Sequence, residues 1–583
     1  MKTKTKTNKS RIITLFWLFT GFAGLLTLRL VKLQYFDHSY YLDRADAQHL
    51  GQAELPAIRG EIRDRNNVVL ATSIARWSVA VNPELIRQNG VAAEAVEVLR
   101  ESLGENEGYL KRLMEQPGTF AWVARKVSDE QASQVREAGL DGFILKKEPT
   151  PGKRYYPKGR LASHLLGTTG IDDQGLDGLE SSYEHRLAGE PGVLSALMDR
   201  DGWATLEHPT ALIRPAVPGN NVILTIDETI QYAAEKELAR QVKEYNGTGG
   251  IVVVMDARNA EILAMAINPD FPAEDFGEVD PSLRRNRSIT DPYEPGSTFK
   301  VFLAAAALNS GVRPGDRFQS GGSMIIDGWP IHNANDGLYA GAMESVKDII
   351  AYSFNVGTAS LAFHIGKDTY YKHLLKFGFG DETGIDLVGE SGGILAPANT
   401  WARINTATIS FGQGVSATPV QLCSAMQSIA NGGVRMKPRV VKAVTDFEGN
   451  VVERFDPEIL GETISPAAAK NMLSILENVC ENGTGKRARV PGYRVGGKTG
   501  TAQLVEPGGG GYAAGQYIAS FLGVAPIDDP RIVVLIKIER PQPYWGGLVA
   551  GPVFNRVAEK ALWKLGVKPD PKLLKRDLSK NGH

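Results

Sequence analysis

Cysteine is nearly absent from this chain of 583 residues, which contains only Cys423 and Cys480. Two cysteines cannot form the disulfide framework that holds small secreted domains together. Both lie in apolar, helix-like stretches, which favours two buried thiols, although a disulfide bond between them stays possible from the sequence. The nine histidines include no His-Glu-x-x-His sequence and no paired-ligand spacing. We therefore expect no catalytic metal and no cofactor.

An excess of charge of one sign is also missing, because 65 basic and 66 acidic residues give a net charge of −1. This balance gives no reason to expect nucleic-acid binding. The glycine-rich stretch 508–511 lacks the Gly-x-x-x-x-Gly-Lys-Ser/Thr pattern of a phosphate loop and is expected to link two strands flexibly. The composition, 43% hydrophobic and 22% charged, suits ordinary globular cores, and the length predicts about two to four domains.

One long apolar run is present, at residues 12–28, and it would form about 25 Å of helix. That length is slightly short of a ~30 Å hydrocarbon core, and Leu30, Val31 and Leu33 can extend it. No small-x-small cleavage site follows, so an uncleaved signal anchor at 12–31 is favoured over a cleaved signal peptide. Five cations precede the run: Lys2, Lys4, Lys6, Lys9 and Arg11. They predict a cytoplasmic tail at 1–11 and a single-pass protein of the cytoplasmic (inner) membrane, with its catalytic part on the periplasmic or extracellular side.

The sequence changes character near residue 222, which suggests two large domains after the anchor. Residues 32–221 indicate mixed helix and strand, and the stretch 91–140 has helix-like spacing throughout. Further elements are predicted as a helix at 228–243, strands at 251–255, 261–266, 493–501, 520–525 and 532–538, and a closing helix at 553–565.

Helical motifs lie between the two groups of predicted strands, so one sheet has to be assembled from both ends of this region. The expected fold class is therefore multidomain α+β. It has a five-stranded antiparallel sheet covered by helices, with a helical subdomain inserted, within a domain at 222–566. Residues 567–583 are mostly polar and are expected to be a flexible tail.

Three short motifs carry the chemistry, and they are Ser297-Thr298-Phe299-Lys300, Ser353-Phe354-Asn355 and Lys498-Thr499-Gly500-Thr501. Pro295-Gly296 predicts a tight turn before an apolar helix, which places Ser297 near a helix N-terminus that favours negative charge. Lys300 follows at i+3 and can be the general base for the Ser297 nucleophile. A lysine acts as a base only where burial or neighbouring cations lower its pKa, and Lys498 can be that neighbour.

The second motif supplies a hydroxyl and an amide. In a loop or strand-like conformation Ser353 and Asn355 would point to the same side, with Phe354 turned to the core. Ser353 can relay a proton between Lys300 and a leaving amine, and Asn355 can hold a substrate amide through its donor and its acceptor.

The third motif is expected to end a strand. Its glycines, including Gly500, would allow a peptide substrate to pair along the strand. Lys498 supplies positive charge, and the hydroxyls of Thr499 and Thr501 can bind a terminal carboxylate. The backbone N–H groups of Ser297 and Thr501 can form an oxyanion hole. The three motifs in this order match the boxes of enzymes that acylate a serine with penicillin or D-Ala-D-Ala peptides.

Longer segments around these motifs resemble the class B penicillin-binding proteins, which are membrane-anchored D,D-transpeptidases that cross-link peptidoglycan. The similar segments are residues 59–66, 154–157, 164–167, 175–180, 293–300, 410–414 and 546–554. The resemblance covers nearly the whole chain. It implies a non-catalytic pedestal domain of the dimerisation type at 32–221 and a β-lactamase-like transpeptidase domain at 222–566.

The segment Tyr-Glu-Pro-Gly-Ser-Thr-Phe-Lys at 293–300 is similar to the cell-division (FtsI-type) branch of this family. The elongation branch tends to have a second proline in place of the glutamate. The resemblance implies septal cell-wall synthesis. The implied partners are peptidoglycan stem peptides (lipid-linked or on nascent glycan), β-lactams, a SEDS-type septal glycosyltransferase (FtsW-like) and other division proteins.

Other functions share the three motifs. A β-lactamase or a D,D-carboxypeptidase would contain them too, but the anchor, the long N-terminal domain and the lack of a clear Glu-x-x-Leu-Asn box argue against a β-lactamase. An elongation-type transpeptidase, and a penicillin-sensing or scaffold protein that does not turn over, stay open as alternatives.

Overall fold

The computed structural model describes residues 5–41, 50–74, 76–147, 153–198, 204–334, 341–506 and 511–580. Lys2 and Lys4 of the predicted tail and positions 508–510 of the glycine-rich stretch lie outside these residues. The chain divides into two compact units. The first consists of Met1–Ile58 and Glu190–Val217, and the second of Arg59–Gly189 and Pro218–His583.

The first unit begins with the long helix α1 (Thr5–Val31), which continues as a π-helix (Lys32–Phe36). The stretch Lys9–Phe36 is long and apolar enough to cross a membrane, and no residue of its most apolar part is buried against protein. An apolar helix without protein packed on it suits a bilayer. The predicted span 12–31 lies within this stretch. The unit also contains an antiparallel sheet of β1 (Leu50–Leu55), β8 (Gly192–Met198) and β9 (Ala204–Arg214).

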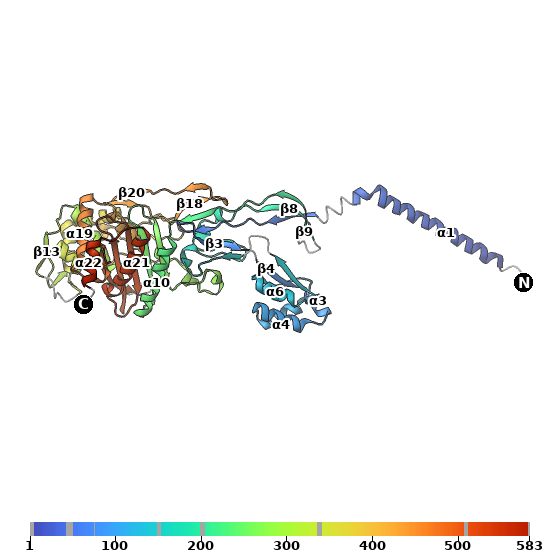
Figure 1. The fold of residues 1–583 in the computed structure, drawn as a ribbon, viewed down its shortest axis with the longest axis horizontal. Coiled ribbons are helices and arrows are strands. Elements are labelled where there is room, and N and C mark those ends of the chain that lie inside the picture. The colour runs from blue at the N-terminus through green and yellow to red at the C-terminus, as the bar shows by residue number, and fades with distance from the viewer. Residues whose placement is uncertain are drawn as a thin grey trace. The chain divides into compact units, whose positions relative to one another are not determined.

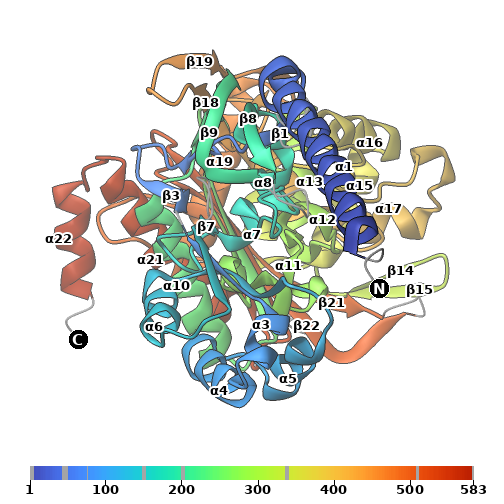
Figure 2. The ribbon, with the colours of Figure 1, turned by 90° about the vertical axis from the view of Figure 1, so that its right-hand side faces the viewer.

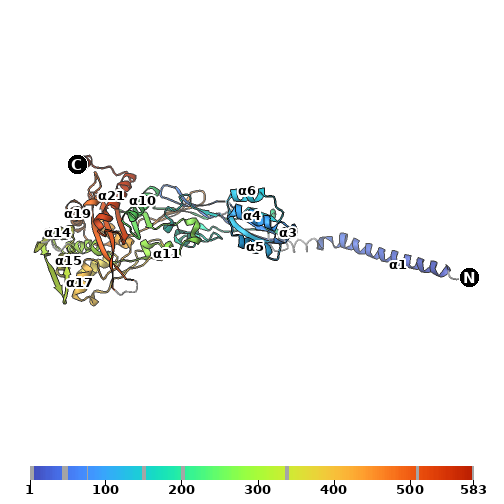
Figure 3. The same cartoon turned by 90° about the horizontal axis from the view of Figure 1, so that it is seen from below.

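The second unit contains a small α/β group with its own apolar core. Its sheet has the order β5–β4–β6, and helices pack on it (Figures 1 and 3). The elements are β4 (Trp77–Val81), α3 (Pro83–Gln88), α4 (Ala92–Leu103), α5 (Glu107–Glu115), β5 (Ala121–Val127), α6 (Asp129–Glu137) and β6 (Phe143–Lys147).

The prediction of helix throughout 91–140 is therefore wrong at β5. Val123 and Val127 are both buried, and their four-residue spacing is compatible with a helix. In the structure both valines reach the same core from a strand, because side chains four residues apart in a strand also point to the same face.

The second unit also contains a six-stranded sheet of order β19–β18–β10–β2–β3–β7. Its strands come from distant parts of the sequence. They are β2 (Ile62–Arg63), β3 (Val69–Ile74), β7 (Lys153–Tyr155), β10 (Asn221–Leu224), β18 (Val441–Thr445) and β19 (Val451–Arg454). Strands β10 and β2 are parallel, and the other pairs are antiparallel. Segments before residue 224 and after residue 440 are thus hydrogen-bonded into one sheet.

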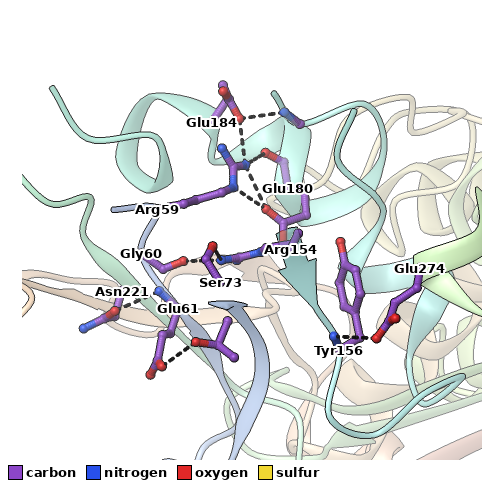
Figure 4. A network of polar contacts seen from close by, with 12 residues as sticks. Arg59, Gly60, Glu61, Ser73, Arg154, Tyr156, Glu180, Glu184, Asn221 and Glu274 are labelled. Atoms are coloured by element: carbon purple, nitrogen blue, oxygen red, sulfur yellow. Dashed lines mark hydrogen bonds and ion pairs between the residues drawn. The ribbon is translucent and has the colours of Figure 1, made fainter. Parts of the chain in front are cut away.

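A buried ion cluster connects three of the segments that resemble the family's N-terminal domain (Figure 4). Glu180, which is fully buried, accepts hydrogen bonds from Arg59 Nε at 2.8 Å and from Arg154 Nε at 2.6 Å. Arg59 also pairs with the half-exposed Glu184 at 2.7 Å, and Arg154 donates to the carbonyl of Gly60 at 2.8 Å. Glu180 is therefore shared by two buried guanidinium groups, and Glu184 gives Arg59 a second counter-ion.

The five-stranded antiparallel sheet predicted from the sequence is confirmed, in the order β12–β11–β23–β22–β21. Its strands are β11 (Gly249–Asp256), β12 (Ile262–Asn268), β21 (Gly496–Val505), β22 (Tyr512–Ala525) and β23 (Ile532–Glu539). Strand β21 is at an edge, which leaves one side of its backbone without a partner strand. The sheet is built from both ends of the region, as the position of the helical motifs requires.

Helices cover both faces of this sheet, because side chains of β11 alternate between two cores. Val252 and Val254 pack with α10 (Glu228–Glu244) and α21 (Gly551–Lys564), which lie side by side (Figure 2). Ile251 and Val253 face the opposite core, which includes residues of α13 (Lys300–Asn309), α18 (Pro419–Ala430) and α19 (Pro466–Glu481). Helices 228–243 and 553–565 are thus confirmed, with small shifts of their ends.

The inserted helical subdomain is confirmed as well. Besides α13, α18 and α19 it contains α14 (Val346–Tyr352), α15 (Asn355–Ile365), α16 (Lys367–Lys376) and α17 (Arg403–Ser410). Shorter helices of the second unit are α7 (Ser163–Leu166), α8 (Gly178–Ser182), α9 (Glu184–Leu187), η2 (Ala273–Glu278), α11 (Pro281–Arg284), α12 (Arg287–Thr290), η3 (Gly296–Phe299), η4 (Ala398–Thr400), η5 (Lys486–Ala488) and α20 (Gly546–Val549). Its other strands are β13 (Arg317–Gln319), β14 (Ser323–Ile326), β15 (Trp329–His332), β16 (Met343–Ser345), β17 (Val434–Met436) and β20 (Ile459–Glu462).

Two further predictions can be compared with the structure. Cys423 and Cys480 are both buried free thiols, in α18 and α19, which confirms the prediction of two buried thiols over a disulfide bond. The segment after residue 566 contains the helix α22 (Pro571–Lys580), which was not predicted. Its mobility stays a prediction.

Candidate active site

Ser297 lies in the 3-10 turn η3, directly before α13. The turn is held from within, because the buried hydroxyl of Thr298 donates to the carbonyl of Pro295 at 2.8 Å. Ser297 itself is only partly buried, and its hydroxyl makes no hydrogen bond to any residue that the structure describes. The hydroxyl is therefore available to a substrate, at the start of a helix as the sequence predicts.

A second segment supports the turn from outside. Gly296 N donates to the carbonyl of Gly412 at 3.1 Å, and Tyr293 and Ala417 exchange two backbone hydrogen bonds of 3.0 Å. Gly412 has φ of +81°, and a Cβ at this position would lie 2.2 Å from the carbonyl oxygen of Gly296. Only glycine fits between the two segments, so Gly412 determines where the Ser297 turn can lie.

Lys300, Ser353 and Asn355 are brought together by hydrogen bonds. Lys300 Nζ donates to Ser353 O at 2.7 Å, to Ser353 Oγ at 3.1 Å and to Asn355 Oδ1 at 2.7 Å. The amide of Asn355 also donates to the carbonyl of His332 at 2.9 Å. Both ends of this amide are therefore engaged inside the protein, and its contact with a substrate stays a prediction.

Of the two conformations expected for Ser353-Phe354-Asn355, a loop or a strand, the structure has a short turn between two helices, and the strand-like form is wrong. Ser353 is the C-cap of α14 with φ of +65°, Phe354 is extended and buried, and Asn355 begins α15. The left-handed residue at the end of α14 reverses the chain, and this junction of two helices turns Ser353 and Asn355 toward the same lysine. The shared direction was predicted correctly, but it arises from a helix junction and not from the alternation of a strand.

Lys498 approaches the same hydroxyl from the sheet. Its Nζ donates to Ser353 Oγ at 3.0 Å and to the carbonyl of Thr499 at 3.0 Å. Both lysines are fully buried. Burial, together with the nearby Lys498 ammonium, holds the pKa of Lys300 well below the usual lysine value. Burial also lowers the pKa of Lys498 to about 7. The site can therefore hold a neutral amine near neutral pH.

The third motif lies at the beginning of β21 and not at its end, because the strand continues to Val505. Thr501 Oγ1 accepts a hydrogen bond from Gly546 N at 3.3 Å, so its O–H is still available as a donor. The space beside Gly500 is filled by the protein, since a Cβ there would lie 2.3 Å from Ser520 Oγ. The role of Gly500 toward a substrate stays a prediction.

Two residues of the site were missed in the sequence. Thr484 Oγ1 is hydrogen-bonded to Thr499 Oγ1 at 2.8 Å. The buried Asn333 accepts from Val356 N at 3.1 Å and donates to the carbonyl of Ser320 at 2.8 Å, which fixes the start of α15. Neither residue belongs to a motif of recognisable spacing, and only the tertiary structure shows their place.

Residues of all three motifs line a cavity of about 780 Å³. Its lining includes Ser297, Ser353, Asn355, Thr499 and Thr501, together with Gln413, Thr484 and Trp545. Lys300 and Lys498 are not part of the lining and lie buried behind Ser353. A cavity of this size accommodates a peptide-sized ligand next to an unbonded serine hydroxyl.

Comparisons with known proteins agree with this geometry. Residues 250–559 match the family described as "Penicillin binding protein transpeptidase domain", and residues 54–224 match "Penicillin-binding Protein dimerisation domain". The chain is 36% identical to Stage V sporulation protein D of Bacillus subtilis, over 88% of this chain and 79% of that protein. It is 29% identical to peptidoglycan D,D-transpeptidase FtsI of Escherichia coli, over 95% of this chain and 93% of that protein.

A solved structure is similar as well. Penicillin-binding protein 3 from Mycobacterium tuberculosis, in complex with aztreonam, has a TM-score of 0.68 and 29% sequence identity, over 90% of this chain and 99% of that chain. Within the described residues one N-terminal helix could cross a membrane, and the protein is a single-pass, membrane-anchored one. The chain therefore belongs to the class B penicillin-binding proteins and is a serine-type D-Ala-D-Ala transpeptidase of peptidoglycan synthesis.

Proposed function

We propose that the chain cross-links stem peptides through a Ser297 acyl-enzyme in septal cell-wall synthesis. The observation that carries the mechanism is the position of Ser353 Oγ, 3.1 Å from Lys300 Nζ and 3.0 Å from Lys498 Nζ. A single hydroxyl between two buried lysines can pass a proton from one to the other. Ser353 and Ser297 both line the cavity, and the two lysines lie buried behind Ser353.

In the first half-reaction Ser297 Oγ attacks the carbonyl carbon of the D-Ala-D-Ala bond. Neutral Lys300 accepts the proton of Ser297, and Ser353 relays a proton to the leaving amine. The backbone N–H groups of Ser297 and Thr501 stabilise the oxyanion. Thr499 and Thr501 bind the terminal carboxylate, and Asn355 and Gly500 contact the peptide. In the second half-reaction an amine of another stem peptide takes the acyl group, which completes a ping-pong transfer.

Adduct mapping tests the acyl-enzyme. The full chain in detergent is treated with a penicillin, digested and analysed by mass spectrometry. We expect one adduct, on Ser297. An adduct on another residue would overturn the mechanism. Turnover is tested by supplying lipid-linked glycan together with the polymerase, because formation of cross-linked product separates a transpeptidase from a protein that only senses penicillin.

The pH dependence of acylation is a second prediction. A base works in its neutral form, so the rate rises with pH through the pKa of the base. An unperturbed lysine, with a pKa near 10.4, would give a rise that continues to about pH 10. Because burial and the nearby Lys498 hold the pKa of Lys300 well below that value, we expect the rate of penicillin acylation to reach its plateau well before pH 10. Stopped-flow acylation rates between pH 5 and 10 measure this. A rise that continues to pH 10 would exclude a depressed lysine as the base.

A third prediction concerns the support of the Ser297 turn. In Gly412→Ala the new Cβ, 2.2 Å from Gly296 O, displaces the turn, and we expect penicillin acylation to slow by about 10². Gly414→Ala is the matched control. Its φ of +76° imposes a similar backbone strain, but its Cβ would meet nothing closer than 3.7 Å. Equal acylation rates in the two variants would contradict the supporting role of Gly412.

The septal role and the surroundings of the enzyme are part of the proposal. The motif at 293–300 and the likeness to FtsI over 95% of the chain support the division branch. We propose an N-terminus in the cytoplasm, a catalytic domain outside the inner membrane and a SEDS-type glycosyltransferase (FtsW-like) as partner. Depletion should give filamentous cells. Round cells would indicate elongation, and a defect limited to spores would indicate the role named for the Bacillus subtilis relative.

The domain division is proposed as well. Its parts are a tail at 1–11, the membrane span at 12–31, the pedestal at 32–221, the transpeptidase domain at 222–566 and a C-terminal tail at 567–583. The family matches at 54–224 and 250–559 lie inside or close to these limits and support the division.

A further inference from the structure

The charge of the cavity lining is one-sided. The described residues that line the cavity include no aspartate or glutamate, but they include Lys486 and Arg487. Two more basic residues, Lys300 and Lys498, are buried directly behind Ser353. A cleft with cations and no carboxylate in its described lining concentrates anionic ligands and disfavours cationic ones.

Lys486 and Arg487 have no ion-pair partner among the described residues, and both are exposed. The acids nearby in the sequence are already paired, since Glu481 pairs with Arg489 at 3.2 Å and Glu477 pairs with Arg494 at 2.7 Å. The two cations at the cavity are therefore free to pair with a ligand, unlike the basic residues that follow them.

The segment that carries them is held firmly. Thr484 N donates to the carbonyl of Ala351 at 3.1 Å, and its hydroxyl is bonded to Thr499. Backbones approach closely on both sides. A Cβ on Gly483 would lie 2.2 Å from Ala351 O, and a Cβ on Gly547 would lie 2.4 Å from Thr484 O. Lys486 thus follows two residues after Thr484, whose hydroxyl is bonded to Thr499 of the third motif. The backbone that carries Lys486 and Arg487 is therefore preorganised.

This location corresponds to the leaving-group side of the scissile bond. In the proposed function Thr499 and Thr501 bind the carboxylate of the D-Ala that leaves. The acceptor amine has to approach the acyl carbon from the place that the leaving amine vacated, because the second half-reaction reverses the first. A group attached to the acceptor amine therefore lies near Thr499, Thr484 and the two cations.

We infer that Lys486 and Arg487 form a binding subsite for the carboxylate of the acceptor, and so select an amine that has a carboxylate close to it. This inference rests on the proposed function and names the acceptor class. In the step concerned, the amine nitrogen forms a bond to the acyl carbon, the bond from that carbon to Ser297 Oγ breaks, and the amine proton ends on Ser297 Oγ.

Two matched acceptors test the subsite. The full chain in detergent is acylated with an N-acyl-D-alanyl thioester that has an uncharged leaving group, and aminolysis is followed with D-alanine and with D-alaninamide. The ratio of the two rates is compared between wild type and the double variant Lys486→Gln/Arg487→Gln, so that the different reactivities of the amines cancel. We expect the double variant to lower this ratio about fivefold, the magnitude of partly exposed charge pairs. The wild-type preference for D-alanine should also fall as salt rises.

Lys470→Gln is the matched control, because it removes one exposed charge from α19 outside the cavity lining, and it should leave the ratio at the wild-type value. An unchanged ratio in the double variant, or an equal loss with both acceptors, would overturn the subsite while the acyl-enzyme stands. Failure of the thioester to acylate Ser297 would overturn the proposed function, and the subsite with it.

Discussion

A Ser297→Ala variant is expected to retain no covalent label after treatment with a fluorescent penicillin and to form no cross-linked product. Without the hydroxyl there is no atom from which the ester can form, and the neighbouring hydroxyl of Ser353 is already bonded to two lysines. The variant should fold normally, because Ser297 Oγ makes no hydrogen bond to a described residue whose loss would leave a buried group unsatisfied. Gel fluorescence after denaturation measures the label.

Thr298→Val is the matched control for this variant. Thr298 is the next residue and is fully buried, and the carbonyl of Pro295 is the only partner of its hydroxyl among the residues that the structure describes. Removal of that hydroxyl should cost stability of about 1 kcal/mol and leave the covalent label in place. A covalent label that persists in Ser297→Ala would contradict the assignment of the nucleophile. So would the loss of the label in both Ser297→Ala and Thr298→Val when both variants fold normally.

A Glu180→Ala variant is expected to lose about 3–5 kcal/mol of folding stability. The substitution removes the carboxylate that both Arg59 and Arg154 contact, and these guanidinium groups are almost completely buried. Arg154 would then be buried without a carboxylate partner among the described residues, and Arg59 would keep the partly exposed Glu184; burying an uncompensated cation costs far more than an exposed ion pair contributes. Urea unfolding of the full chain in detergent, followed by tryptophan fluorescence, measures the loss.

Glu184→Ala separates this effect from the loss of any charge. Glu184 contacts Arg59 at 2.7 Å but is 38% exposed, so we expect a change of at most about 1 kcal/mol. Glu180→Gln should lie between the two, because it keeps acceptors for the arginines but no charge. A Glu180→Ala variant as stable as Glu184→Ala would show that solvent or a rearranged side chain replaces the carboxylate.

The order of elements in the catalytic domain could be predicted from the sequence because its strands and helices have strong local patterns. Gly249–Asp256 is buried at every position, and Asp227 caps the helix that begins at Glu228 by accepting hydrogen bonds from Thr229 N and Ile230 N. Strand β5 was missed, because residues four apart share one face of a strand as well as one face of a helix.

The motifs predicted which residue types the site contains, but not how they meet. Ser353 adopts a left-handed conformation that is uncommon for residues other than glycine, and no local pattern indicates it. Thr484 and Asn333 were missed for a related reason, since both act through contacts with residues brought near only by the fold. The roles of the motif residues in turnover stay predictions that the variants above test.

The six-stranded sheet has a consequence for how the chain folds. Strand β10 (Asn221–Leu224) pairs with β18 (Val441–Thr445), which the ribosome makes more than 200 residues later. At about 5–20 residues per second, the edge of β10 waits roughly ten to forty seconds for its neighbour. All four residues of β10 are buried in the folded protein, and until β18 is made one edge of β10 has no partner strand. The strand is prone to wrong pairing during that time. Newly made chains should therefore depend on chaperones until β18 emerges, and truncation before residue 441 should leave the N-terminal part prone to aggregation.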